Sequence, residues 1–336
     1  MTVSVGLIGG GNISDTHARA VRAVADAQLT AIYGTNSEKV QRLSREHGGV
    51  AYADLESFLA HRPMDMVMVG SPSGLHAVHG IAAARNGLHV LVEKPIDITT
   101  ERADALIAEA ETAGVKLGVI FQDRCKPGIR RMKDLVDRGV LGNLILADAR
   151  VKWYRPPEYY ANSRWRGTWS LDGGAALINQ GVHTVDLVLW FLGNVSRVQA
   201  AMTTKLHNIE AEDTLAALLE FESGALGVLQ AATSIYPGYP RRIELTGSEG
   251  TMILEQDRLI EAQFRRGNSA SILTEGLHAN SSASSPVVSD HRAHQAVLED
   301  FIRAIETDSL PACGGPEGRR SLALIESIYR CCREMV

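Results

Sequence analysis

The chain lacks most of the features that mark secreted and membrane proteins. It has 336 residues and four cysteines, which are too few and too irregularly spaced for a disulfide framework. Such cysteine usage is typical of a reducing cytosol. No apolar run approaches the roughly 18 residues of a membrane span, and a strand pattern begins within a few residues of Met1, so no signal peptide is expected. We therefore expect a cytoplasmic protein without a membrane partner.

The chain also lacks a basic excess. Lysine and arginine together number 34 against 39 acidic residues, which gives a net charge of −5. Nucleic-acid binding requires a basic surface that contacts phosphates, so nucleic acid is not an expected partner. Apolar residues make up 45 % of the chain, enough for sizeable cores, and the length is typical of two domains.

Short apolar segments alternate with amphipathic ones through the first third of the sequence. Strands are expected at residues 3–8, 29–33, 64–69, 88–92 and 115–121, and helices at 14–24, 38–46, 75–86 and 100–113. Strict alternation of this kind predicts a parallel sheet with helices on both faces. Residues 1–122 are therefore predicted to form a doubly wound α/β domain of the Rossmann type, which binds dinucleotides.

The pattern changes after residue 122. A helix at 127–137 and a strand at 144–153 precede a helix that begins after Asp172. Six further strands follow between residues 195 and 264, then a serine-rich loop at 280–285 and helices at 291–306 and 318–333. Strands joined by tight turns pair antiparallel. Residues 123–336 are predicted to form an α+β substrate and oligomerisation domain with an open, mostly antiparallel sheet. Helices would cover one face, and a second copy the other, in a homodimer or homotetramer.

A glycine-rich turn lies between the first strand and the first helix. Gly9 allows the tight turn, and Gly11 lets the backbone approach a pyrophosphate that caps the helix N-terminus. Ser14 stands where Gly or Ala is usual. We predict cofactor contacts from Gly9, Gly11, Asn12 and Ile13; the alternative is a plain glycine turn.

The end of the second strand bears on the choice of dinucleotide. Selectivity for NAD usually depends on an acid there, which binds the ribose diol. The sequence instead has Thr35, Asn36 and Ser37, whose hydroxyl and amide groups can bind a 2′-phosphate, with Lys39 as a possible counter-charge. Glu38 is interpreted as a first-turn acid of the next helix. We expect the cofactor to be NAD(P), with NADP favoured over NAD.

Glu93-Lys94-Pro95 follows the buried strand at 88–92. A lysine beside a nicotinamide cation and a hydrophobic wall has a lowered pKa and can accept a hydroxyl proton. Pro95 ends the strand, and a cis Lys–Pro bond would turn Lys94 into the cleft. Lys94 is predicted to be catalytic and to lie, with Glu93, beside the cofactor. The alternative is a surface salt bridge between the two neighbours.

A glycine pair at 173–174 precedes an amphipathic helix that carries Asn179, His183 and Asp186. Asn179 and His183 are four residues apart and share a helix face. An amide and an imidazole on one face can hold a hydroxyl and move its proton. The alternative is a helix whose polar residues satisfy local backbone. His183 and Asp186 could also be a metal pair, but no third ligand is evident, so no metal is predicted.

The glycine turn at 9–14, the segment 93–95 and the helix at 173–186 together resemble the Gfo/Idh/MocA family of NAD(P)-dependent oxidoreductases. The resemblance covers the whole chain in order and spacing. It implies hydride transfer between nicotinamide and a carbinol carbon of a sugar, cyclitol or nucleotide sugar. By this resemblance, Lys94 orients the substrate hydroxyl and relays its proton, and His183 is the second acid/base.

Position 179 departs from many members of this family, which carry Asp where this chain has Asn179. An amide cannot take a proton, so Asn179 would only position the substrate. The segments 153–160 and 165–169 look like the branch containing UDP-N-acetylglucosaminuronate 3-dehydrogenases. Rings pack on sugar faces and guanidinium binds carboxylate, so Tyr160, Trp165 and Arg166 are predicted substrate-binding residues. Core packing or a dimer contact is the alternative.

The remaining predicted site residues lie at strand ends of the first domain and in the 173–186 helix. Ligands bind at the carboxyl ends of parallel strands. Gln122 is predicted to bind the cofactor. Arg124 and Asp186 are predicted to bind the substrate. Ser71, Pro72 and His76 match a family stretch that lines the cofactor. Arginines 241 and 242 are interpreted as a solvated strand end, and histidines 17, 79 and 89 as ordinary helix or strand-end residues.

Two other functions remain possible on this fold, because a fold does not determine a function. One is a non-catalytic NAD(P)-binding regulator. The other is a redox-neutral glycosidase that uses bound NAD⁺ transiently. Retention of both Lys94 and His183 favours the oxidoreductase, since a regulator has no need of a proton relay.

Overall fold

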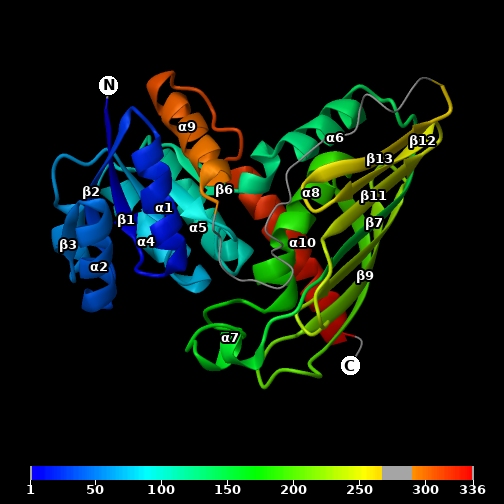
Figure 1. Cartoon of the computed structure of the whole chain (residues 1–336), viewed down its shortest axis with the longest axis horizontal. Helices are drawn as coiled ribbons and strands as arrows, with labels where there is room; N and C mark the ends of the chain where they lie inside the picture. The colour runs from blue at the N-terminus through cyan, green and yellow to red at the C-terminus, as the bar shows by residue number, and fades with distance from the viewer. Residues whose placement is uncertain (1, 267–289, 335–336) are drawn as a thin grey trace. The chain divides into compact units, whose positions relative to one another are not determined.

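The computed structural model describes residues 2–266 and 290–334. The serine-rich loop expected at 280–285 lies outside the described residues. The chain divides into two compact units. The first comprises residues 1–122 and 287–322, and the second residues 123–286 and 323–336. Figure 1 shows the helices and strands of each unit.

The first unit is built on a six-stranded sheet with the order β3-β2-β1-β4-β5-β6. Every pairing in it is parallel, which confirms the predicted doubly wound α/β sheet. Its strands are β1 Val3–Ile8, β2 Ala27–Tyr33, β3 Val50–Tyr52, β4 Met66–Val69, β5 His89–Glu93 and β6 Leu117–Ile120. The chain order reverses between β1 and β4, and ligands of such sheets bind at this switch point, beyond the carboxyl ends of the strands.

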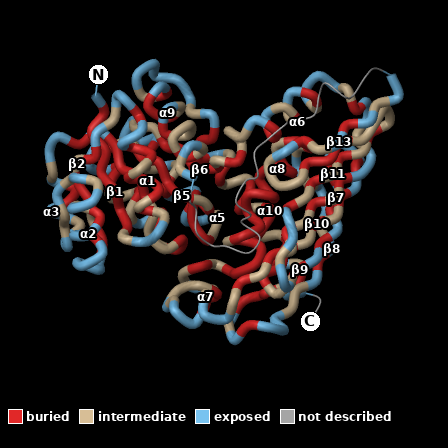
Figure 2. The backbone as a smooth tube through the Cα atoms, viewed as in Figure 1, coloured by how far each residue is buried: buried red, intermediate tan, exposed pale blue. Residues whose placement is uncertain are grey.

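The helices of the first unit follow its strands. They are α1 Asn12–Ala23, α2 Ser37–His47, α3 Leu55–Leu59, α4 His76–Arg85, α5 Thr100–Thr112 and α9 Arg292–Glu306, with a short 3₁₀ turn, η1, at Ser73–Leu75. Strands β1, β4 and β6 are buried along their whole length (Figure 2). This explains their continuous apolar sequences, because a parallel strand is covered on both faces.

Helix α9 packs beside α1 in the first unit (Figure 1). Its Leu298, Phe301 and Ile302 join the core that β1 and β2 form with α1. The sequence pattern placed this helix in the second domain. Chain order alone does not tell which sheet a late amphipathic helix covers.

The second unit contains a seven-stranded sheet with the order β13-β12-β11-β7-β10-β9-β8. Only β7 and β10 pair in parallel among these strands, so the sheet is mostly antiparallel, as predicted. The strands are β7 Leu144–Lys152, β8 Val195–Thr203, β9 Thr214–Phe221, β10 Leu226–Ala232, β11 Arg242–Gly247, β12 Gly250–Glu255 and β13 Arg258–Phe264. Burial alternates along β9 and β11, so one face packs on a core and the other is open.

Four further helical segments belong to the second unit: α6 Pro127–Asp137, α7 Pro157–Ala161, η3 Ala176–Gly181 and α8 Val182–Leu192. Residues 323–334 of α10 Gly315–Glu334 join them, and η2 Gln122–Cys125 lies at the boundary between the units. The segment η3 is a π-helix, although the sequence predicted one continuous α-helix after Asp172. No helix within the described ranges is long and apolar enough to span a membrane.

Candidate active site

The glycine turn leads directly into α1. Gly9 has a φ of +136°, and a Cβ there would lie 2.6 Å from the carbonyl oxygen of Gly70. Gly11 is the N-cap of α1, and none of the described side chains caps the helix there. A Cβ on Gly11 would meet no described atom within 4 Å. The first amide groups of α1, from Asn12 and Ile13 onward, therefore start at an open backbone surface that suits a pyrophosphate.

The residues after β2 have local structural partners. The Asn36 side chain caps α2 by accepting a hydrogen bond from Lys39 N at 3.0 Å. Ser37 Oγ accepts a hydrogen bond from Gln41 Nε2 at 3.2 Å. Thr35 is exposed, and Glu38 lies in the first turn of α2 as expected.

His76 connects two of the predicted cofactor segments in the first unit. Its ring nitrogens lie 2.7 Å from Pro95 O and 2.9 Å from Ser71 O. The side chain is buried, and burial lowers its pKa. His79 adds a contact to Ser71 Oγ at 2.9 Å, and burial lowers the pKa of His79 to about 4. His76 therefore holds the strand end at Ser71 and Pro72 against the Lys94–Pro95 peptide, which is cis.

Glu93 is buried beside two histidines of the first unit. Its Oε1 lies 2.9 Å from His17 Nε2 and 3.6 Å from His294 Nε2, and its Oε2 accepts from Lys94 N at 3.2 Å. Burial opposes ionisation, but the two histidines hold the pKa of Glu93 well below its usual range. These three side chains have the spacing of a metal site, and His17 donates a direct hydrogen bond to the carboxylate. His17, interpreted from sequence as an ordinary helix residue, thus ties α1 to the segment that carries Lys94.

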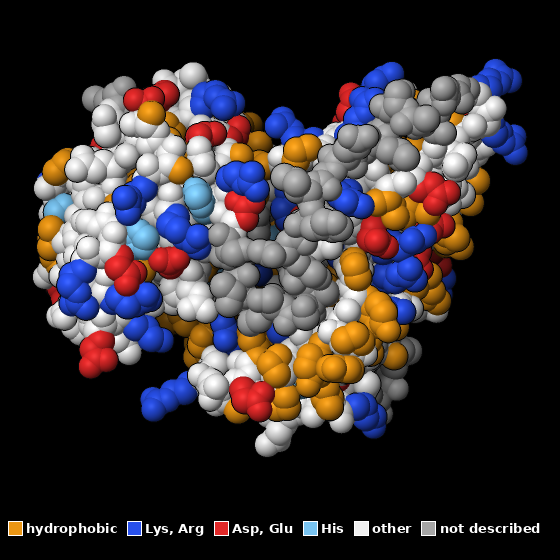
Figure 3. All heavy atoms as spheres, in the orientation of Figure 1, with side chains coloured by type: hydrophobic (Ala, Val, Ile, Leu, Met, Phe, Trp, Pro, Cys, Tyr) orange, Lys and Arg blue, Asp and Glu red, His pale blue; other side chains and the backbone are white. Residues whose placement is uncertain are grey.

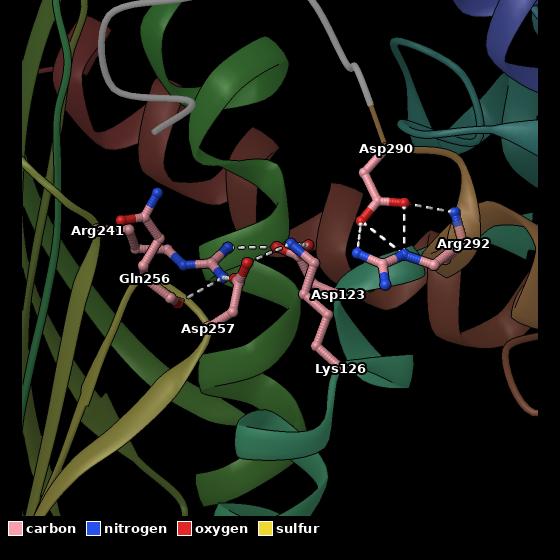
Figure 4. A network of polar contacts seen from close by, with 7 residues as sticks. All are labelled: Asp123, Lys126, Arg241, Gln256, Asp257, Asp290 and Arg292. Atoms are coloured by element: carbon pink, nitrogen blue, oxygen red, sulfur yellow. Dashed lines mark hydrogen bonds and ion pairs between the residues drawn. The ribbon is translucent and has the colours of Figure 1, made fainter. Parts of the chain in front are cut away.

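The second unit begins with a buried ionic network (Figure 4). Lys126 Nζ lies 2.6 Å from Asp123 Oδ1 and 2.9 Å from Asp257 Oδ2, and Arg241 pairs with both carboxylates. Although burial works against the charge, Arg241, Lys126 and His183 hold the pKa of Asp123 well below its usual range. Arg241 is 5 % exposed, so its interpretation as a solvated strand end is wrong. A local pattern cannot show that two distant acids neutralise it.

Arg124 and Asp186, both predicted to bind substrate, bind each other in the second unit. The guanidinium donates from Nε to Asp186 Oδ2 at 2.8 Å and from Nη2 to Oδ1 at 2.6 Å. Arg124 also lies over the Trp190 ring, 5.2 Å from its centroid. This bidentate pair joins η2 to α8. Contact of either residue with a substrate stays a prediction.

Asn179 belongs to a chain of polar contacts inside the second unit. Its Nδ2 donates to Asp172 Oδ1 at 2.6 Å, and its Oδ1 accepts from Gln180 Nε2 at 2.8 Å. Asp172 Oδ2 in turn accepts from Gly167 N at 2.8 Å, and Gln180 Oε1 accepts from Arg155 Nη2 at 2.8 Å. The amide is therefore oriented before any substrate arrives.

The aromatic segment of the second unit divides into a core part and a more accessible part. Tyr160 is buried, and its hydroxyl donates to Thr233 Oγ1 at 2.9 Å. Arg166 is half-buried and stacks on the Tyr159 ring at 4.2 Å and near the Trp165 ring at 5.5 Å from each centroid. Hydrophobic side chains gather around α7 in Figure 3. The stacked guanidinium suits an anion bound beside a ring.

The structure brings each group of site residues together within its own unit. The first unit groups the glycine turn, the 71–76 segment, Glu93 and Lys94; its Gln122 has a buried Oε1 with no hydrogen-bond partner among the described residues. In the second unit, Gln180 donates both to Asn179 Oδ1 and to the Tyr159 hydroxyl, which links Asn179 to the aromatic segment. The sequence analysis missed Asp123, although it lies between two residues that were singled out. It also missed Asp172 and Gln180, whose adjacency to the motif was the available signal.

Two family models match the chain. One, described as "Oxidoreductase family, NAD-binding Rossmann fold", matches residues 3–121. The other, described as "GFO/IDH/MocA C-terminal domain", matches residues 129–253. The two matches follow each other and fall in the first and the second unit.

Curated relatives and solved structures agree with these matches. An inositol 2-dehydrogenase of Rhizobium meliloti is 25 % identical, with 99 % of this chain and 98 % of the relative covered. Inositol 2-dehydrogenase 3 of Saccharopolyspora erythraea is 31 % identical over 76 % of this chain and 73 % of the relative. The structure of the WlbA dehydrogenase from Bordetella pertussis, in complex with NADH and UDP-GlcNAcA, superposes with a TM-score of 0.90. It is 31 % identical, and 100 % of this chain and 98 % of that chain are covered.

Proposed function

The chain belongs to the GFO/IDH/MocA family and is an NAD(P)-dependent oxidoreductase of the sugar and polyol dehydrogenase kind, and from this premise we propose that it oxidises a carbinol carbon of a nucleotide sugar. Lys94 and His183 relay the proton of the reacting hydroxyl. The observation that carries the proposal is the end-to-end similarity to a dehydrogenase structure that holds NADH and UDP-GlcNAcA. Sugars and cyclitols are the next substrate classes, since curated relatives are named for inositol.

The dinucleotide would bind at the carboxyl edge of the first unit's sheet. The uncapped start of α1 and the open surface at Gly11 suit the pyrophosphate. Thr35 and the start of α2 suit a 2′-phosphate, because the end of β2 offers no acid to a ribose diol. We therefore propose NADP over NAD. Gln122 Oε1, which has no hydrogen-bond partner among the described residues, is an acceptor for an amide group.

The bound nicotinamide would supply the acceptor for a hydride, and the chain's own residues would handle the proton. As the carbon–hydrogen bond breaks, the hydroxyl proton passes to Lys94 Nζ or to the His183 imidazole. Asp123 attracts a charged His183 within the second unit, although Arg241 and Lys126 already pair with this carboxylate. Asn179 has no proton to exchange and would orient the hydroxyl through its amide.

The half-buried Arg166 favours a substrate that carries an anion. It lies over two aromatic rings, and a guanidinium held flat in this way keeps its edge for a carboxylate or a phosphate. Tyr160 would act by supporting this segment, because its hydroxyl is already bonded to Thr233. A UDP-uronate fits both kinds of group, because its sugar ring can pack on an aromatic ring and its anionic groups can pair with Arg166.

A substrate screen tests the proposal. The wild-type protein is incubated with NADP⁺ or NAD⁺ and with UDP-GlcNAcA, neutral sugars or inositols, and the absorbance of the reduced nicotinamide is followed. Lys94→Met should abolish the signal, and Lys205→Met, at an exposed lysine, should not. Cleavage products without net reduction would indicate the redox-neutral glycosidase. Cofactor binding without turnover on any class would indicate a regulator.

We also propose that a second copy of the chain covers the open face of the second unit's sheet. Leu146, Leu218 and Leu226 are each about half exposed there, on the neighbouring strands β7, β9 and β10. A contiguous apolar patch on a sheet face marks an interaction surface. A homodimer or homotetramer results. No disulfide is formed among the described residues, which suits a cytoplasmic protein.

A further inference from the structure

The N-terminal end of η3, the helix that carries Asn179, is capped from two distant parts of the second unit. A helix start leaves four backbone amide groups without intrahelical partners. Here Glu212 Oε2 accepts from Ala175 N at 3.2 Å, Glu212 O from Ala176 N at 3.1 Å, and Glu212 Oε1 from Leu177 N at 2.7 Å. Ile178 N donates to the Tyr329 hydroxyl at 3.3 Å. One glutamate and one tyrosine thus satisfy all four amides.

The two capping residues also bind each other. The Tyr329 hydroxyl donates to Glu212 Oε1 at 2.8 Å, and both side chains are buried. We call Glu212 and Tyr329 the η3 cap. The cap explains the second glycine of the motif. Gly174 has a φ of +150°, and a Cβ there would lie 2.2 Å from the Tyr329 hydroxyl oxygen.

The contacts of the η3 cap fit an ionised carboxylate at position 212. Each contact just described that reaches its side chain comes from a donor, two from backbone amides and one from a hydroxyl. An amide side chain would turn its NH₂ group toward one of these donors and leave it unsatisfied. Negative charge at a helix start is also favoured by the helix dipole. Among the described residues, Glu212 and Tyr329 are sufficient to accept hydrogen bonds from all four amides.

We propose that Glu212 and Tyr329 are positioning residues for the reaction, because they set the place of Asn179 and of His183, which follows one turn later. This inference rests on the proposed function, since the proposed function places the reacting hydroxyl at Asn179 and His183. A π-helix is rare and is frequently found at functional sites. The η3 cap holds this turn at its start, and the Asn179–Asp172 hydrogen bond orients the amide that it presents.

The test compares Glu212→Gln, Glu212→Asp and Tyr329→Phe with two exposed controls, Glu222→Gln and Tyr239→Phe. Glu212→Gln and Tyr329→Phe should lower kcat/KM by about 10- to 100-fold, the scale of a small misplacement of reacting groups. Their Kd for NADPH should not change. Glu212→Asp should recover part of the loss, because it keeps an acceptor-only group. The controls should behave as wild type.

A second measurement separates this inference from the proposed function. Hydrogen–deuterium exchange of a peptide covering 175–183 should rise in Glu212→Gln and Tyr329→Phe, whether or not a substrate is known. Variants that unfold at lower temperature but keep wild-type kcat and KM at 25 °C would give the cap a merely structural role and overturn the inference. A wild-type protein that turns over no substrate while exchange rises as stated would overturn only the proposed function.

Discussion

At the scale of single residues, the proposed chemistry depends on two side chains that share one proton. Lys94→Met should leave the Kd for the cofactor nearly unchanged, because in the proposed site the glycine turn, and not Lys94, holds the pyrophosphate. It should lower turnover by about two to four orders of magnitude, the usual contribution of a positioned acid or base. His183→Ala should do the same. The double variant should be little worse than either single one, because both residues serve the same step.

Steady-state kinetics on the substrate found in the screen measures these effects, with Lys205→Met as the control for a lost positive charge. If Lys94→Met kept near-normal turnover, the proton-relay hypothesis would be contradicted and the regulator hypothesis would be favoured. Asn179→Ala should mainly raise KM, because an amide can only position the hydroxyl. A loss in kcat as large as that of His183→Ala would contradict this role.

The cofactor preference is also a matter of a few residues. NADP(H) should bind more tightly than NAD(H), since the end of β2 offers the Thr35 hydroxyl and no acid to the 2′ position that we propose to bind there. Calorimetric titration of both dinucleotides measures the difference. Thr35→Asp should reverse the preference, because an acid repels the 2′-phosphate and accepts from the ribose diol. Tighter NAD(H) binding by the wild type would mean that Thr35 or Asn36 binds the diol directly.

The residues that sequence reasoning could find share one property. Gly9, Lys94 and His183 stand inside short motifs whose residue types and spacing carry a physical reason. Glu212 and Tyr329 do not, since they lie 35 and 151 residues from the amides that they cap. A pairing over such distances exists only after folding, and an isolated buried glutamate gives no pattern.

At the scale of elements, the buried carboxylate of the η3 cap makes stability depend on pH. Burial raises the pKa of Glu212 to about 7, although Leu177 and Tyr329 donate hydrogen bonds to it. The folded state therefore binds this proton more tightly than the unfolded state, whose pKa is near the ordinary value of 4.5. The contribution of this bound proton to stability is therefore fully present below pH 4.5 and is lost as the pH rises through 7, where Glu212 becomes the acceptor-only carboxylate of the η3 cap.

Urea unfolding of wild type and Glu212→Gln at pH 5 and pH 8 measures this dependence. As the pH rises, the free energy of unfolding of the wild type should fall relative to that of the variant, by at most about 3 kcal/mol. Using the difference between the two proteins cancels the titration of other groups, including Asp172. A difference that does not change with pH would show that Glu212 titrates in its ordinary range.

The elements themselves followed from sequence to different degrees. The parallel strands and their helices could be predicted, because strands buried on both faces are continuously apolar and the connecting helices are amphipathic. The π-helix η3 could not, since its sequence satisfies an α-helical pattern equally well. The placement of α9 on the first unit could not be predicted either, because the apolar face of an amphipathic helix can pack on the exposed face of either sheet.

At the scale of the whole molecule, the open face of the second unit's sheet predicts self-association. Charges of like sign lie directly opposite each other across β7 and β11, where Arg150 pairs with Arg242 and Asp148 with Glu244. Like charges directly opposite each other repel, although Arg242 also pairs with Glu244 at 3.3 Å and with Glu255 at 3.9 Å, which offsets the repulsion within one copy. In an interface with two-fold symmetry the same patch meets itself, and the acidic pair of one copy can face the basic pair of the other. The exposed leucines beside these pairs add apolar area.

Leu218→Lys should therefore dissociate the assembly, because it places a charge in the centre of the apolar patch. Light scattering coupled to size-exclusion chromatography measures the mass of wild type and variant at equal concentration. Leu310→Lys is the matched control, since Leu310 is 89 % exposed and belongs to the first unit. The wild type and the control should have the mass of a dimer or tetramer, and Leu218→Lys that of a monomer or smaller assembly. A wild-type protein that is a monomer at dilution and fully active would mean that the open face is not an interface between copies of this chain.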